Sequence, residues 1–473
     1  MTQIIIRTLV GDTKTFSDDD INGFRAGIRG DVLTGTDSNY DDVRAIWNAM
    51  IDNKPGLIAR CTGTADVAAS VRWAREQGVL VSVRGAGHNI AGKSVQDGVM
   101  LIDLSMMRSV RVDPTNKTAV AGPGATLGDV DHEAQAFGLA VPTGINSTTG
   151  IGGLTLGGGF GWLSRSLGLT IDNLVGAEVV TANGERVHCS ENEHPDLFWA
   201  TRGGGGNFGI VTSFEFNLHP VGPEVMSGPL VFAHEETHNV LRGYRDFCKT
   251  CPDELTVWAV LRGAPPFPFV PPEHHGKKVL ILASLYNGPL DAGKKAMAPL
   301  RSLGSPIGDA IAPHPYAGFQ QAFDPLLTPG ARNYWKSHNF TELSDGLLDT
   351  LVENAANLPS PQSEIFIAQM GGATKRVASD ATAYPHRDVE FVMNVHTRWE
   401  DPAEDDKCIA WARKFYKDTE PFATGGVYVN FISEGDDRAD GAYGANHDRL
   451  VKVKSKYDSD NFFRLNQNIA PTA

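Results

Sequence analysis

Glycine gathers in three short stretches of the chain, and each stretch adjoins a run of β-branched residues. They are residues 85–92 ("GAGHNIAG"), 144–161 ("GINSTTGIGGLTLGGGFG") and 203–209 ("GGGGNFG"). Because glycine has no Cβ, the main chain at such places can bend sharply and approach another group closely. Three such stretches favour a long, nucleotide-like ligand that lies against main chain over three unrelated turns.

The first stretch does not match the two commonest nucleotide-binding fingerprints. The Rossmann pattern needs a third glycine and a crossover helix, but only "AGKSVQDG" separates this turn from the next strand. Gly92, Lys93 and Ser94 reproduce the end of a Walker P-loop, yet they lie in the same tight loop with no helix after them. The sequence therefore favours a different cofactor fold.

Residues 40–219 alternate short β runs with helical patterns. Apolar residues at helical spacing predict a helix over 65–77 that stops at Gly78, and alternation predicts strands at 81–84, 99–105 and 118–124. Asn183 and Gly184 between two apolar runs predict a hairpin. The alternating residues 210–219 predict a half-buried strand that ends before a boundary at Pro220 and Gly222.

Beyond residue 222, longer helical patterns and prolines replace the glycine stretches, which indicates a second domain. Two segments alternate in the same way, 390–399 ("EFVMNVHTRW") and 425–434 ("GGVYVNFISE"). In the first, Phe391, Met393 and Val395 share one face, while the other carries Val392, Asn394 and His396. We therefore expect two strands of a sheet that packs helices on one face and roofs a cavity with the other.

Composition limits the possible partners. The chain carries 42 Lys and Arg against 56 Asp and Glu, a net charge of −14, which should repel nucleic acid and anionic lipid. The opening residues "MTQIIIRTLVGD" contain too short an apolar run for a signal peptide, and no later run reaches the length of about 18 apolar residues typical of a membrane span. We expect a soluble, cytosolic protein that binds neither nucleic acid nor membrane.

Five cysteines, an odd number, do not form a disulfide framework. Cys248 and Cys251 form a CxxC, as half a zinc site or a redox pair would, but no second CxxC or paired histidine follows at ligand spacing. Since the pair closes an amphipathic stretch that Pro252 stops, we interpret it as structural and expect no metal site.

Several long motifs together resemble one family. "RGAGHNIAG", "PTGINSTTGIGGLTLGGGFGWLSRSLGLTIDNL", "RGGGGNFGIVTSFEF", "RNYWKS" and "YGANHDRLVKVKSKYDSDNFFRLNQNI" closely resemble, in order, the berberine-bridge-enzyme-like FAD-linked oxidases of the vanillyl-alcohol-oxidase superfamily. The resemblance implies an α+β protein with a two-domain PCMH-type FAD-binding fold. It places an FAD-binding domain at residues 1–220, an inserted substrate domain of antiparallel sheet covered by helices at 221–444, and a C-terminal segment that returns to the FAD domain at 445–473.

The resemblance also implies that His88 is bonded covalently to the 8α-methyl group of FAD, which would make the flavin a stronger oxidant and prevent its loss. Further FAD contacts are implied for Arg84, Gly85, Ala86, Gly87, Asn89, Gly144, Asn146, Thr149, Gly150, Gly152, Gly153, Gly159, Ile210, Val211, Asn466 and Asn468.

The chain departs from the family pattern at three places. Asn146 stands where many relatives link the flavin a second time through cysteine, so we expect a single, histidyl link. Phe431 replaces the second tyrosine of a YxNY motif, and Val392 stands near a glutamate that is the base in some plant enzymes. The candidates left for the catalytic base are Tyr428, His396, Asn394 and Lys336.

The function expected from this resemblance is oxidation of a C–OH or C–N group of a small organic substrate. A hydride would leave the substrate carbon for flavin N5, and dioxygen would be reduced to hydrogen peroxide; the compact Thr149 beside Gly150 leaves room for dioxygen. Two alternatives remain open: a dehydrogenase that uses another electron acceptor, and a flavin-binding protein without turnover. The sequence identifies neither the substrate nor the oligomeric state.

Overall fold

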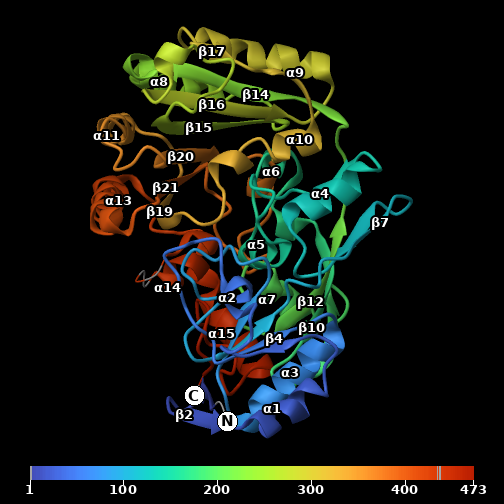
Figure 1. Cartoon of the computed structure of the whole chain (residues 1–473). Helices are drawn as coiled ribbons and strands as arrows, with labels where there is room; N and C mark the ends of the chain where they lie inside the picture. Colours follow the sequence, from blue (N-terminus) through green and yellow to red (C-terminus); the bar gives the residue numbers. More distant parts are fainter. Residues whose placement is uncertain (1–2, 434, 436–437, 473) are drawn as a thin grey trace.

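Two groups of β-sheets divide the chain between them (Figure 1). The structure, a computed structural model, describes residues 3–433, 435 and 438–472. Strands β1–β13 come from residues 4–220, and strands β14–β21 of one large sheet come from residues 224–399. Both chain termini lie at the far end of the first group (Figure 1).

The first sheet of the N-terminal half carries the strand that leads to the first glycine stretch. Its order is β3-β4-β6-β5, with β4, β6 and β5 parallel, and helix α3 (Thr64–Gln77) connects β4 to β5. Gly78 ends α3 with φ +69°, as its glycine predicts. The strands are β3 Val32–Leu33, β4 Leu57–Arg60, β5 Val81–Arg84 and β6 Met100–Asp103.

The second sheet is antiparallel, in the order β11-β10-β12-β8-β7. The predicted hairpin is confirmed: β10 and β11 pair around Gly184, whose φ is +73°. The strands are β7 Val110–Asp113, β8 Thr118–Ala121, β10 Leu174–Val180, β11 Arg186–Ser190 and β12 Ile210–Asn217.

Two short strand pairs and six helices complete this half. The pairs are β1 Ile4–Arg7 with β2 Thr13–Phe16, and β9 Leu139–Ala140 with β13 His219–Pro220. The helices are α1 Asp18–Arg25, α2 Tyr40–Arg44, α4 Leu127–Gln135, α5 Ile151–Gly157, α6 Ser164–Leu167 and α7 Pro195–Thr201.

The large sheet is antiparallel in the order β17-β14-β16-β15-β20-β21-β19, with β18 paired to β14. Its strands are β14 Glu224–Ala233, β15 Leu255–Gly263, β16 Lys278–Tyr286, β17 Gly308–Asp309, β18 Ala312–Pro315, β19 Arg332–Phe340, β20 Glu364–Gln369 and β21 Phe391–Trp399. The helices of this half are α8 Thr237–Cys248, α9 Leu290–Met297, α10 Tyr316–Gln320, α11 Asp345–Ala355, α12 Ala373–Arg376 and α13 Asp405–Thr419.

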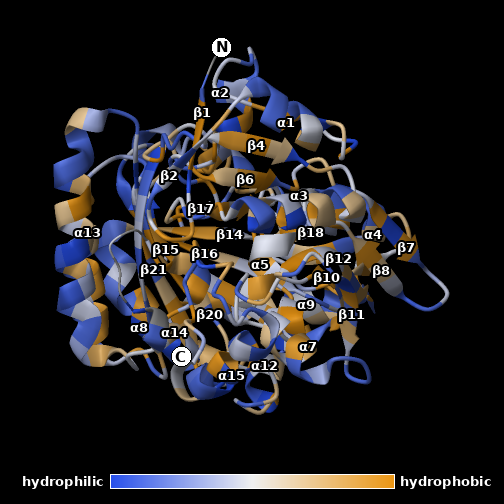
Figure 2. Ribbon diagram, turned by 90° about the horizontal axis from the view of Figure 1, so that it is seen from below, coloured by the Kyte–Doolittle hydropathy of each residue, from blue (hydrophilic) through white to orange (hydrophobic). Residues whose placement is uncertain are grey.

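One face of the large sheet packs against helices. Apolar side chains of α8, α9, α11 and α13 form a single core with that face, and α13 turns its apolar stripe inward (Figure 2). The predicted alternation in β21 is confirmed, because Phe391, Met393 and Val395 join this core while Val392 belongs to the core on the opposite face. The opposite face is directed toward the N-terminal half.

The predicted strand at 425–434 is wrong. Residues 425–433 form an irregular connector with one 3-10 turn, Val429–Phe431. Polar side chains hold it in place of a strand ladder: Asn430 Nδ2 donates to the carbonyls of Gly153 and Leu154 at 3.2 and 3.3 Å. The Ser433 hydroxyl both accepts from the Trp335 N–H at 3.1 Å and donates to the Trp335 carbonyl at 2.8 Å. The Ser433 side chain thus pairs with the N–H and the carbonyl of Trp335 at the edge of β19, where alternation suggested another strand.

The C-terminal segment returns to the N-terminal half, where its red ribbon lies beside the blue (Figure 1). Helices α14 (Ala439–Tyr443) and α15 (His447–Tyr457) lead into it. The buried Lys454 ammonium donates to the carbonyls of Asn207 and Phe463 at 2.8 and 3.0 Å and to Asp458 Oδ2 at 2.6 Å. One ammonium group therefore binds α15, the third glycine stretch and the tail together.

The structure is consistent with the three proposed domain segments, whose limits remain a prediction. Among the described residues, no helix combines the length and apolar character needed to cross a bilayer.

Candidate active site

A cavity of about 360 Å³ lies between the glycine stretches and the helix-free face of the large sheet. All three glycine stretches contribute to its wall, together with strands of both halves and the tail residues 463 and 465–467. The wall includes Trp47, Ser82, Gly85, Ala86, Gly87, His88, Asn89, Ser94, Gly144, Asn146, Thr149, Gly150, Gly152, Gly153, Phe160, Gly206, Ile210, Val211, Trp258, Trp335, Glu364, Phe366, His396, Tyr428, Phe431 and Asn466.

The glycines of the cavity wall have two roles: some allow main-chain segments to pack closely, and others leave space at the wall. A Cβ on Gly150 would lie 2.9 Å from Ala86 Cβ, and a Cβ on Gly85 would lie 2.9 Å from the Pro123 carbonyl oxygen, so these positions hold two main-chain segments in contact. A Cβ on Gly153 would meet nothing within 4 Å, and one on Gly206 would have only Asn466 Nδ2 near, at 3.9 Å. The bare main chain at these two positions therefore leaves space for a ligand to lie against it.

Hydrogen bonds to neighbouring side chains decide which ring nitrogen of His88 carries the proton. The Thr148 hydroxyl donates to Asn146 Oδ1 at 2.7 Å, and the Thr148 N–H also donates to this oxygen, at 3.0 Å. The same hydroxyl lies 3.0 Å from His88 Nε2. Because its own proton is already donated to Asn146, it accepts a hydrogen bond from the Nε2–H group. Nδ1 then carries the lone pair, with only the Thr149 hydroxyl near it, at 3.5 Å.

Two further features of His88 suit a nucleophilic role. Its ring is stacked on Trp47, with centroids 5.2 Å apart and an interplanar angle of 22°. Burial lowers the pKa of His88 to about 4. At neutral pH the imidazole is therefore uncharged, and its lone pair is available to form a bond.

Most of the expected cofactor contacts lie at the cavity, but three do not. Arg84 is a buried structural cation: its guanidinium pairs with Asp103 at 2.8 Å and donates to the Val43 and Ala45 carbonyls. Gly159 contacts Tyr428 instead, and Asn468 is exposed. For these three residues the structure gives no support for a direct contact with the cofactor.

A row of four side chains crosses the large sheet at the cavity. The strand registers place Arg262 opposite Glu364, Glu364 opposite His396, and His396 opposite Trp335, all on the same face. Arg262 Nη1 donates to Glu364 Oε2 at 2.5 Å, and Glu364 Oε1 lies 3.4 Å from His396 Nδ1. The Trp335 ring packs edge-on against His396 at 4.7 Å. We call these four residues the cross-strand row.

Within the cross-strand row, Glu364 and His396 are placed to share one proton when the pair accepts it. Asn333 Nδ2 donates to the Ala331 carbonyl at 2.8 Å, which turns its Oδ1 toward His396 Nε2 at 3.1 Å. Nε2 therefore carries a proton, and the Nδ1 to Oε1 contact is favourable only when one of these two atoms is protonated.

The environment keeps this pair ready to accept a proton. Burial lowers the pKa of His396, against the attraction of Glu364. Burial would raise the pKa of Glu364, but the attraction of Arg262 and His396 leaves it below its ordinary value. Both groups therefore favour their basic forms at neutral pH.

Tyr428 lines the cavity but does not have the properties of a base. Its phenol oxygen accepts hydrogen bonds from the Gly159 N–H and from Asn430 Nδ2, each at 3.0 Å. Burial raises the pKa of Tyr428 to about 12, despite these two bonds. The hydroxyl is therefore protonated at neutral pH and can only donate to a ligand.

Two of the candidate catalytic residues do not reach the cavity. Lys336 lies on the helix-covered face of β19, with its ammonium 5.5 Å from the centre of the Tyr416 ring of α13 and 5.8 Å from that of Tyr334. Strand alternation explains this, because Trp335 points to the cavity and its neighbour must point away. Asn394 is fully buried one row beyond His396, opposite Ser337 and Phe366, and is not part of the cavity wall.

Aromatic rings form most of the remaining wall near the cross-strand row. Trp258 and Phe366 stack with centroids 5.7 Å apart and an interplanar angle of 8°, and Phe431 packs edge-on against Trp335, Phe366 and Tyr428. A small side chamber of about 40 Å³ adjoins these rings and is lined by Trp162, Trp258, Phe267, Phe323 and Phe366, with Arg262 and Glu364 as its charged groups.

Sequence reasoning missed Glu364, Trp47 and Trp335. A signal for Glu364 was present: in "EIFIAQ" a lone carboxylate shares one strand face with Phe366 and Ala368, while Ile365 and Ile367 occupy the other. Trp47 lies in a loop without periodicity, so no pattern indicated its contact with His88.

The cavity has the features that FAD requires. Ser82 Oγ, Ser94 Oγ and Asn466 Oδ1 are buried polar atoms of its wall that have no hydrogen-bond partner in the described part of the chain. Buried polar atoms of this kind are normally satisfied, so they favour a polar ligand at the glycine-lined end. The aromatic rings and the cross-strand row occupy the other end, where a substrate would contact the cofactor.

Comparisons with known proteins agree with this geometry. Residues 55–190 match the family described as "FAD binding domain", and residues 427–470 match "Berberine and berberine like". The (R)-6-hydroxynicotine oxidase of Paenarthrobacter nicotinovorans is 32% identical over 94% of this chain and 97% of its own length. The xylooligosaccharide oxidase of Thermothelomyces thermophilus is 31% identical over 90% of this chain and 89% of its own.

A solved structure shows the same likeness in three dimensions. The crystal structure of 6-hydroxy-D-nicotine oxidase from Arthrobacter nicotinovorans superposes with a TM-score of 0.83 at 30% identity, covering 94% of this chain and 98% of the other.

Proposed function

Since this chain belongs to the berberine-bridge-enzyme-like family of FAD-linked oxidoreductases, we propose that it is an oxidase that removes hydrogen from a C–OH or C–NH group of an aromatic substrate. The cross-strand pair Glu364 and His396 carries this proposal, because it offers a buried proton acceptor inside the cavity that the glycine stretches form.

When bound in this cavity, FAD would supply the acceptor for two electrons, with dioxygen as the final acceptor and hydrogen peroxide as the product. The main chain at Gly153 and Gly206 and the polar atoms of Ser82, Ser94 and Asn466 would hold it. His88 Nδ1, which carries the lone pair because Nε2 donates to Thr148, would bond to its 8α carbon. Asn146 would support this histidyl link by accepting the hydrogen bond of the Thr148 hydroxyl, and as an amide it cannot form a second link.

Glu364 and His396 would take the O–H or N–H proton of the substrate. The proton settles between Glu364 Oε1 and His396 Nδ1, 3.4 Å apart, and Arg262 and Asn333 hold the outer atoms of the pair. General-base assistance of this kind contributes about 10²- to 10⁴-fold to a rate. The Tyr428 hydroxyl can orient the substrate by donating a hydrogen bond.

The cavity wall favours a flat, largely apolar substrate over a sugar. Trp258, Phe366 and Phe431 present ring faces and edges, whereas a sugar would need many hydrogen-bonding side chains. Near the row, polarity is concentrated on Glu364 and His396, which suits one hydroxyl or amine on an aromatic framework.

The test is anaerobic mixing of the purified protein with aromatic alcohols, aromatic amines and, in parallel, aldoses and short oligosaccharides. Bleaching of the visible flavin band by aromatic substrates and not by the sugars is expected, and the reverse pattern contradicts the substrate class. No bleaching by any compound would favour a binding protein without turnover.

The electron acceptor is tested separately with the best substrate. Turnover in air with one hydrogen peroxide formed per substrate supports an oxidase. Turnover only under nitrogen with an added dye would instead identify a dehydrogenase.

A further inference from the structure

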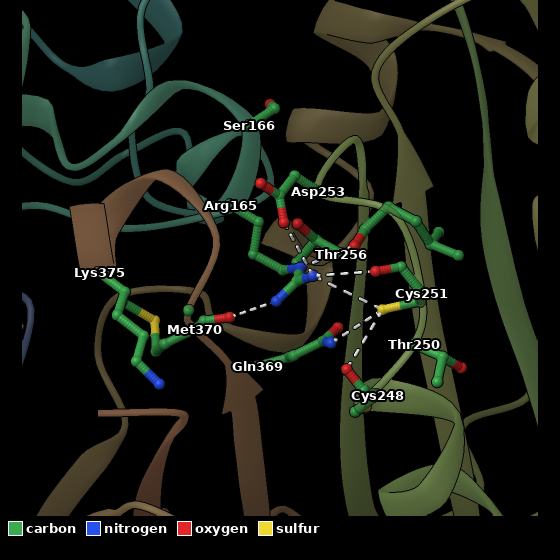
Figure 3. A network of polar contacts seen from close by, with 12 residues as sticks. Arg165, Ser166, Cys248, Thr250, Cys251, Asp253, Thr256, Gln369, Met370 and Lys375 are labelled. Carbon is green, nitrogen blue, oxygen red and sulfur yellow. Dashed lines mark hydrogen bonds and ion pairs between the residues drawn. The ribbon is translucent and has the colours of Figure 1, made fainter. Parts of the chain in front are cut away.

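A second group of reactive side chains lies away from the cavity, where helix α8 ends (Figure 3). Helix α8 ends at Cys248, and Cys251 lies in the turn that follows, where its N–H donates to the Phe247 carbonyl at 3.1 Å and keeps the i to i+4 spacing of a helical turn. Side chains three positions apart on a helical turn have Cβ atoms about 5–6 Å apart. A disulfide needs about 3.5–4.5 Å, so a small shift at this helix end brings the sulfurs into bonding range.

Two donors point at the Cys251 sulfur, and its own thiol donates to the Cys248 carbonyl at 3.7 Å (Figure 3). Gln369 Nε2 donates to it at 3.2 Å, and the Arg165 guanidinium donates at 3.6 Å. Gln369 cannot turn its oxygen to the sulfur without losing the bond that its Oε1 accepts from the Val257 N–H at 3.0 Å. A guanidinium and an amide N–H favour the negative charge that develops on a sulfur as it attacks.

Arg165 is held firmly in this position. Its guanidinium donates to the carbonyls of Leu255 at 2.9 Å and Met370 at 2.5 Å and pairs with Asp253 at 3.6 Å. Asp253 offsets part of the positive charge, but its own side chain is 37% exposed and is also paired with Arg376. The Arg165 guanidinium therefore stays beside the Cys251 sulfur.

The surroundings of the two cysteine thiols differ. Cys248 and Cys251 are both half-buried, and Cys251 lies between the exposed residues Thr250 and Pro252. Burial and the neighbouring Cys251 sulfur raise the pKa of Cys248, which makes Cys248 the slower thiol. By contrast, Cys61, Cys189 and Cys408 are buried.

We propose that Cys251 and Cys248 form a peroxide-reactive dithiol, in which Cys251 is oxidised first and Cys248 closes a disulfide. The Cys251 sulfur attacks one peroxide oxygen, the O–O bond breaks, and the second oxygen leaves as water after taking up a proton. The Cys248 sulfur then attacks the resulting sulfenic acid, the S–S bond forms, and a second water leaves with the Cys248 proton. That the peroxide comes from the cavity of the same molecule rests on the proposed function; the reactivity of the pair does not.

The experiment treats the purified, flavin-loaded protein with hydrogen peroxide, labels the remaining thiols with a maleimide under denaturing conditions, and maps the peptides by mass. Loss of label from both Cys248 and Cys251, with a peptide mass two hydrogens lighter, is expected at least about tenfold faster than loss at the three buried cysteines. Equal rates at all five cysteines, or label retained at both positions, would overturn the proposal.

Two variants test the order of events. In Cys248→Ser, a sulfenic acid on Cys251 should accumulate and react with dimedone. In Cys251→Ser, dimedone labelling at Cys248 should be at least about tenfold weaker, and equal labelling in the two variants would contradict the assignment. Cys189→Ser is the matched control and should oxidise like the parent.

A third measurement tests the reactivity of the dithiol and the production of peroxide at the cavity independently. Disulfide formation with added peroxide, but not with substrate in air, would support the dithiol and contradict peroxide production at the cavity. Formation during turnover that catalase prevents would support both.

Discussion

The two walls of the cavity are built from different parts of the amino acid. The glycine wall presents main chain, and its most distinctive positions, Gly153 and Gly206, contribute by the absence of a side chain. The sheet wall presents side chains from adjacent strands, with Arg262, Glu364 and His396 in register. A main-chain wall suits a ligand that never changes, whereas a side-chain wall can be altered one residue at a time. This division predicts that changes on the first wall affect cofactor retention and changes on the second affect turnover.

The largest effect is expected for His88→Ala on the glycine wall. If His88 Nδ1 forms the bond to FAD, the acid-precipitated parent protein should remain yellow and the variant should be colourless, a change from full to no covalent retention. Absorbance of the washed precipitate measures this. The control His188→Ala, a half-buried histidine on β11, should stay yellow. A yellow precipitate from His88→Ala would contradict the assignment.

Glu364→Gln should distinguish the role of the sheet wall in turnover from the role of the glycine wall in cofactor retention. We expect kcat to fall about 10²- to 10⁴-fold, because the amide cannot share a proton with His396 Nδ1, while the covalent flavin content stays at the parent level. Steady-state kinetics and the visible spectrum measure both quantities. Lys336→Met, on the other face of the same sheet, should change kcat less than about twofold. A larger loss in the lysine variant than in Glu364→Gln would reverse the assignment of the two faces.

The pH dependence of kcat/KM sharpens the role of His396. Its folded pKa lies below its ordinary value of about 6.5, so the neutral, proton-accepting form persists as the pH falls through that value. The acidic limb should therefore lie below pH 6.5, and the matching contribution to folding stability should be lost in the same acidic range. A limb above pH 6.5 in the parent protein would contradict this assignment.

The smallest effect is expected for Tyr428→Phe. The Gly159 N–H and Asn430 Nδ2 lose their acceptor, which should cost about 1–3 kcal/mol of unfolding free energy. Because the pKa of Tyr428 is about 12, its removal should lower kcat less than Glu364→Gln does. Denaturant unfolding and kinetics measure these changes. A loss of kcat as large as that of Glu364→Gln would make Tyr428 the base.

The sequence predicted the glycine wall far better than the sheet wall. Turns that need glycine leave a local trace, and the family resemblance that these motifs carry implied cofactor contacts for His88, Gly85 and Gly153, which line the cavity. The cross-strand row depends on register between strands 100 residues apart, such as Arg262 opposite Glu364, and no local pattern contains that information.

Two errors have the same physical origin. Alternation in residues 425–434 predicted a strand, but Asn430 and Ser433 bind main chain of other segments and bend this stretch into a connector. Lys336 was chosen for its neighbours in a motif, whereas strand periodicity turns it toward α13 and away from the cavity. In both places tertiary contacts decide what the local pattern leaves open.

The ammonium of Lys454 has a consequence for biosynthesis. It joins Asn207 to the tail at Phe463, and the tail supplies Asn466 to the wall, so one side of the cavity is missing until this part of the chain has left the ribosome. Before that point the cavity of a growing chain lacks the part of its wall that the tail supplies. The wall that would hold FAD is therefore complete only after this segment has been translated. A chain truncated before Phe463 should fail to retain the cofactor.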